Sequence, residues 1–125
     1  MTATKKDIGS REDVVRLVDG FYDQVRRDPL LSPVFSHVDW PAHLPVMYSF
    51  WASILLGEGS YQGNPLQKHI HLAIHEGHFE RWLSLFTQTV RSSFDGPKAD
   101  EAVDRAQAIA SLFRHRLGLS LGPSN

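Results

Sequence analysis

Residues 10–35 read SREDVVRLVDGFYDQVRRDPLLSPVF, and this stretch indicates most clearly which fold the chain adopts. Its apolar residues recur at the spacing of one helical face, namely Val14, Leu17, Val18, Phe21, Tyr22 and Val25. Ser10 is a suitable N-cap, with Asp13 three residues on as a weak capping box. Arg26 and Arg27 suit the negative end of the helix dipole, and Asp28-Pro29 ends the helix. The stretch therefore predicts an amphipathic helix followed by a turn-rich segment.

Three more long helices are predicted, and glycine-rich or proline-rich breaks separate them. One begins near Asp39, with Pro41 in its first turn and Pro45 soon after. Another spans about 77–94, and the last spans about 98–117 with a glycine cap at 118. Residues 57–65 contain three glycines and form a loop, while 66–74 form either a brief helix or a strand. Because helices dominate, the predicted fold class is all-α.

Composition limits the chain to one domain and excludes several functions. The 125 residues are predicted to divide into a flexible segment 1–9, a domain 10–118 and a flexible tail 119–125. A net charge of −1 without charge runs gives no footprint for nucleic acid or an anionic membrane. The absence of cysteine excludes disulfides, thiolate-bound metals and thioether-linked haem. No signal peptide or membrane-spanning stretch is visible, so we expect a cytoplasmic protein.

Seven histidines and a dense group of aromatic residues suggest a metal or a flat apolar cofactor. An iron porphyrin needs an imidazole ligand and an apolar slot, and His69 lies among apolar neighbours (Leu66, Ile70 and Leu72). Tyr22 and Trp82 place polar tips on buried helix faces, and His43 begins the apolar face that continues through Met47, Phe50 and Ile54. Two other interpretations stay open: a generic helical core, and a zinc site formed by His71, His75 and His78.

Four segments together resemble the truncated haemoglobins, specifically group III: FYDQVRRDPLLSPVF (21–35), SFWASILLGEGSYQGNPLQKHIHL (49–72), FERWLSLF (79–86) and RAQAIASLFRHRL (105–117). The resemblance covers about residues 10–118 and implies a two-over-two helical sandwich around a non-covalent haem b. It implies that His69, rather than His71, is the proximal iron ligand. Tyr22 and Trp82 would be distal hydrogen-bond donors, and His43 and Met47 would face the ligand. The implied haem contacts are Phe21, Phe35, Phe50, Leu66 and Leu72.

The resemblance also implies what the protein does. O2, CO or NO would bind at the iron on the side of Tyr22 and Trp82, and two donors in a dry pocket would slow O2 release. Slow release favours ligand chemistry, such as reaction of O2 with NO, use of peroxide, or redox sensing, and a catalytic role would need a reductase. Storage or sensing without turnover and a haem-free helical interaction domain are the alternatives. His43 is expected to act as a gate between the pocket and water.

Overall fold

The computed structural model describes residues 5–36, 38–57 and 76–116, and this part of the chain contains helices and no strand. The helices are α1 (Arg11–Arg27), α2 (Trp40–Leu56), α4 (Glu76–Ser93) and α5 (Pro97–Arg116). Each lies within a residue or so of its predicted range. None of the described helices combines the length and the apolar character needed to cross a membrane. The segment 66–74, with His69, Leu66 and Leu72, lies outside the described residues.

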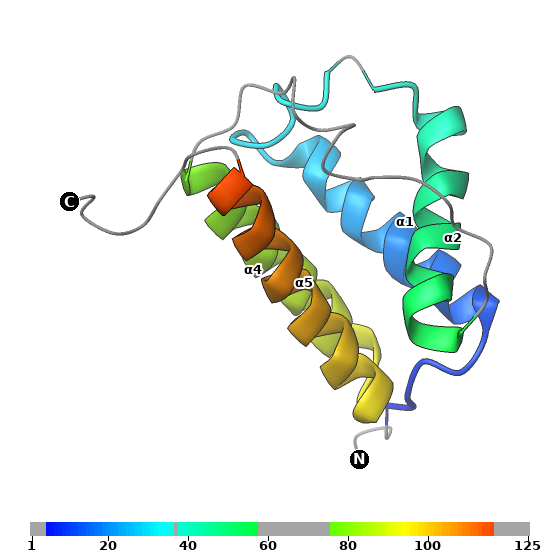
Figure 1. Ribbon diagram of the computed structural model, residues 1–125. Helices are drawn as coiled ribbons and strands as arrows, with labels where there is room; N and C mark the ends of the chain where they lie inside the picture. The colour runs from blue at the N-terminus through cyan, green and yellow to red at the C-terminus, as the bar shows by residue number, and fades with distance from the viewer. Residues whose placement is uncertain (1–4, 37, 58–75, 117–125) are drawn as a thin grey trace.

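The helices form two pairs stacked on each other (Figure 1). α4 and α5 are joined by a short connection at 94–96 and lie side by side, while α1 and α2 form the second pair. α1 packs against α4, and α2 packs more lightly against α5. The all-α, two-over-two arrangement expected from the sequence is therefore confirmed for the described residues.

Both ends of α1 are set by side chains close by in the sequence. Ser10 Oγ accepts the backbone N–H of Asp13 at 3.2 Å, as the capping pattern predicts. The Asp13 carboxylate, however, accepts the N–H of Gly9 at 2.9 Å, one residue before the N–H that a capping box would use. At the other end, Asp28 Oδ2 accepts the N–H groups of Leu30 and Leu31, each at 3.0 Å. These bonds turn the chain sharply out of the helix, as predicted.

α2 begins beside Asp39, but the Asp39 side chain makes no capping hydrogen bond. Pro41 has no N–H to offer, and the N–H groups of Ala42 and His43 bond instead to the main-chain carbonyl of Asp39, at 3.1 and 2.8 Å. The start of α2 is thus held by its backbone and by side-chain packing. The helix ends at Gly57, whose φ of 70° is left-handed.

Residues 5–9 pack against the start of α5, which the sequence did not predict. Ile8 is buried, and the Asp7 carboxylate accepts the N–H groups of Lys98 and Ala99, each at 2.9 Å. Burial alone would raise the pKa of Asp7, but these N–H groups outweigh it and leave the pKa below its usual value. Asp7 is therefore the N-terminal cap of a helix more than 85 residues further along the chain.

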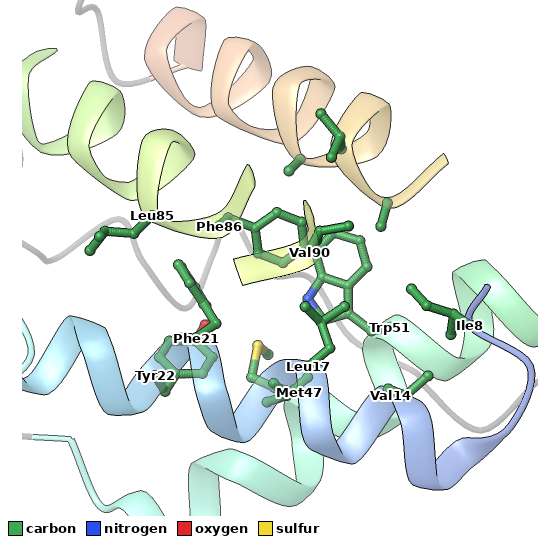
Figure 2. Close-up of a cluster of buried hydrophobic side chains, with 14 of the residues drawn as sticks. Ile8, Val14, Leu17, Phe21, Tyr22, Met47, Trp51, Leu85, Phe86 and Val90 are labelled. Atoms are coloured by element: carbon green, nitrogen blue, oxygen red, sulfur yellow. The ribbon is translucent and has the colours of Figure 1, made fainter. Parts of the chain in front are cut away.

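The core fills the space between the two pairs of helices (Figure 2). The rings of Phe86 on α4 and Trp51 on α2 stack with centroids 4.8 Å apart, and Phe21 on α1 meets Phe86 edge-on at 5.2 Å. Ile8, Val14 and similar residues extend this packing toward the N-terminal end of α1. Near the other end of α1, the same packing leaves a cavity.

Candidate functional site

The cavity lies among all four described helices and the turn after α1. The space between its walls, together with the part that opens to solvent, amounts to about 720 Å³. The walls are mainly apolar, as is typical of cofactor pockets. Its lining residues are Tyr22, Leu31, Val34, Phe35, Met47, Phe50, Trp51, His78, Phe79, Trp82, Ile109, Ala110 and Phe113.

Tyr22 brings a phenol hydroxyl from α1 into this apolar cavity. Its side chain is 5% exposed, and no hydrogen bond is found for its hydroxyl within the described residues. Burial raises the pKa of Tyr22 well above its ordinary value, so the phenol keeps its proton at physiological pH. The hydroxyl is therefore a neutral donor available to a molecule in the cavity.

Trp82 brings the second polar tip, from α4. Its ring meets Phe21 edge-on at 5.6 Å and stacks on Phe86 at 5.7 Å, so aromatic contacts define the plane of the indole. No hydrogen bond is found for the indole N–H within the described part of the chain. Tyr22 and Trp82 thus place two donors on the cavity wall, from two helices that pack against each other.

His43 lies next to Tyr22 but does not line the cavity. Its ring is 5.5 Å from the rings of both Tyr22 and Trp40, and its Nε2 atom is buried. Trp40 also contacts Tyr22, at 5.2 Å, and the Arg26 guanidinium covers its outer face at 5.1 Å. Trp40 and His43 therefore pack against the Tyr22 ring, and neither of them lines the cavity.

The structure places most of the described residues of the predicted site on the cavity wall. Phe35, Met47 and Phe50 line it, together with Tyr22 and Trp82. Phe21 was expected to contact a cofactor, but it is fully buried behind the wall and packs against both donors. The predicted contacts Leu66 and Leu72, like His69, lie outside the described residues.

Sequence reasoning missed part of the wall, including Trp51, His78 and Ala110, together with the neighbouring Trp40. The sequence predicted the helices that carry these residues, but periodicity does not distinguish a packed core from a cavity. Of the three histidines considered for zinc, only His78 is described, and it is buried on the wall. Within the described residues, no cluster of three or more metal-ligating side chains occurs.

The residues present fit a haem. Tyr22 is buried and Trp82 is partly buried, and no hydrogen bond is found for either polar tip within the described residues, so both can donate to a molecule in the cavity. Apolar walls suit a porphyrin, and neutral donors suit a small ligand that carries partial negative charge. The cavity therefore has the apolar surface and the donor groups that a haem with a bound ligand requires.

Comparisons with known proteins agree with this arrangement. The family model for bacterial-like globin matches residues 6–115. Group 3 truncated hemoglobin ctb of Campylobacter jejuni is 36% identical over 115 residues, which cover 86% of this chain and 91% of the relative. Group 1 truncated hemoglobin GlbN of Nostoc commune is 30% identical over 81 residues, 64% of this chain and 69% of that protein. The crystal structure of group III truncated hemoglobin from Campylobacter jejuni matches with a TM-score of 0.83 at 36% identity, covering 91% of this chain and 95% of the other.

Proposed function

The chain belongs to the bacterial-like globin family, and within it to the group III truncated haemoglobins, and we propose that it holds a non-covalent haem b with His69 as the iron ligand. The family implies haem binding. The observation that carries the proposal is the apolar cavity into which Tyr22 and Trp82 bring two donors without partners among the described residues. His69 is supported by the PLQKH motif and by its apolar neighbours in the sequence.

The haem would supply an iron that binds a diatomic ligand such as O2, CO or NO. The chain's own residues would select among these ligands, because donors in a dry pocket favour the ligand that carries most negative charge. Met47, Phe35 and Phe50 would exclude water from the ligand. Each donor hydrogen bond contributes about 1–3 kcal/mol, so two of them would slow the release of O2 by orders of magnitude.

Slow O2 release favours chemistry over transport. We propose conversion of O2 and NO to nitrate, or reduction of peroxide, in the cytoplasm. Nitrate formation from NO and O2 takes up one electron, so a reductase would be the partner. Storage or sensing of O2 is the second candidate function. With excess O2 and an added reductant, consumption of NO with nitrate formed one-for-one over several turnovers per haem would support the enzyme. NO consumption that stops after about one equivalent per haem would favour storage or sensing.

Ligation by His69 is tested by replacement of this residue with alanine. We expect His69→Ala to lose stable haem uptake and to recover it with added imidazole, which can occupy the vacated ligand position. His71→Ala and His75→Ala are the matched controls, and they should keep the wild-type optical spectrum. An unchanged histidine-ligated spectrum in His69→Ala would transfer the role to one of the other two histidines.

A further inference from the structure

An ion pair between a buried carboxylate and a half-exposed guanidinium connects two walls of the cavity. Arg81 Nε lies 2.6 Å from Asp28 Oδ1, and the side chains are 49% and 3% exposed respectively. The other oxygen of Asp28 accepts the N–H groups of Leu30 and Leu31. Burial would raise the pKa of Asp28, but the Arg81 guanidinium and these N–H groups outweigh it and hold the pKa below its usual value. The Asp28 carboxylate is therefore ionised at neutral pH.

Each partner lies beside a residue that lines the cavity. Asp28 ends α1 and fixes the turn that carries Leu31, while Arg81 directly precedes Trp82 on α4. The pair thus ties the turn after α1 to the part of α4 that presents a donor. Because the Asp28 carboxylate is almost fully buried, loss of Arg81 would leave a charge without compensation, and the turn would have to rearrange.

A second polar contact between α1 and α4 allows a comparison. Gln24 Nε2 donates to Thr89 Oγ1 at 2.9 Å, on the same two helices but about two turns further along α4. Neither residue lines the cavity. If both contacts served only to stabilise the packing of α1 on α4, loss of either one would lower the stability of the fold and leave the cavity unchanged.

We propose that Arg81 is a positioning residue: through Asp28 it sets the direction in which the Trp82 N–H points into the cavity. Aromatic contacts with Phe21 and Phe86 define the plane of the indole, and the ion pair fixes how far along α1 the first turns of α4 lie. A hydrogen bond to a ligand tolerates only about 0.5 Å of variation in distance, so a small shift of α4 would weaken it. This inference rests on the proposed haem function.

The test compares Arg81→Gln with Gln24→Ala in the haem-loaded protein. Arg81→Gln should raise the O2 dissociation rate about three- to tenfold and shift the C–O stretching frequency of the CO complex. Gln24→Ala should leave both unchanged, although it removes a contact between the same helices. Asp28→Asn keeps an acceptor for the turn and should behave as Arg81→Gln does. Arg81→Lys keeps the charge and should lie between the wild type and Arg81→Gln.

Two further measurements separate positioning from a general loosening of the fold. In a Trp82→Phe background, Arg81→Gln should have no additional effect on O2 release, because the group that it positions is absent. The indole N–H signal of Trp82 in the NMR spectrum of the CO complex should move in Arg81→Gln and not in Gln24→Ala. Equal behaviour of these two variants, or a full effect of Arg81→Gln in the Trp82→Phe background, would overturn the proposal. Failure of the wild type to bind haem would instead overturn the proposed function.

Discussion

Tyr22→Phe removes one oxygen atom. It should make the haem-free protein more stable, and it should speed the release of O2 from the haem-loaded protein. No hydrogen bond is found for this hydroxyl within the described residues, so its removal should not cost the roughly 0.5–1.5 kcal/mol of an ordinary buried hydrogen bond. It should instead relieve part of the desolvation cost of an unpaired hydroxyl, which is about 1–3 kcal/mol. We therefore expect the haem-free variant to be about 1 kcal/mol more stable than the wild type.

The same substitution should speed the release of O2. A donor bond to a ligand that carries negative charge is worth about 1.5–3 kcal/mol, which corresponds to roughly a ten- to hundredfold increase in the dissociation rate. The assays are urea unfolding of the haem-free protein and stopped-flow release of O2 from the haem-loaded protein. The first assay measures the effect of the Tyr22 hydroxyl when it has no ligand to bond, and the second measures its effect when bound O2 is present.

Tyr48→Phe is the matched control. Its hydroxyl donates to Asp19 across the contact between α2 and α1, and Tyr48 does not line the cavity. This variant should lose a little stability and release O2 at the wild-type rate. If Tyr22→Phe is destabilised in the same way and also keeps the wild-type release rate, the Tyr22 hydroxyl is a feature of core packing and the donor role is wrong.

Three further perturbations test the fold and the access route. Asp7→Ala should cost about 1–2 kcal/mol in urea unfolding, because it removes the cap of α5. The folded-state pKa of Asp7 lies below its usual value of 3.8. The ionised carboxylate therefore stabilises the fold fully above about pH 3.8, and this contribution is lost as the pH falls through the folded-state pKa. The loss of stability in acid should be weaker in Asp7→Ala. Gly96→Ala should destabilise by more than about 1 kcal/mol, because φ is 140° and a Cβ would lie 2.6 Å from Asp7 Cγ, whereas Gly9→Ala has space and should not. His43→Ala should speed CO association more than dissociation in flash photolysis, and a change confined to dissociation would make His43 a ligand stabiliser instead of a gate.

The sequence predicted the helices well because their ends depend on nearby residues. Ser10 caps α1 and Asp28 turns the chain out of it through contacts within a few positions. Long-range contacts gave no such signal. The Asp7 cap of α5 and the Asp28–Arg81 pair join residues that are distant in sequence. Nothing in the sequence distinguishes these charged residues from the many others that could have formed such contacts.

The donors of the candidate site could be predicted in part. Tyr22 and Trp82 are polar-tipped residues on apolar helix faces, and the family resemblance gave them their roles. Trp51 and Ala110 were missed as wall residues for a physical reason: an inward-facing side chain looks the same in a periodic pattern whether it meets another side chain or an empty space. The shape of the cavity depends on how four helices pack, which single-sequence periodicity does not specify.

A haem titration of cavity-filling variants tests most directly whether this cavity is the haem site. Ala110 is buried on the wall, so Ala110→Leu would fill space that a porphyrin needs, while Ala108→Leu changes an exposed position on the same helix. The wild type and Ala108→Leu should bind one haem per chain and develop the same Soret band. Ala110→Leu should bind about ten- to hundredfold more weakly, the equivalent of roughly 1–3 kcal/mol of overpacking. Equal haem affinity in all three proteins would place the haem elsewhere and contradict the account.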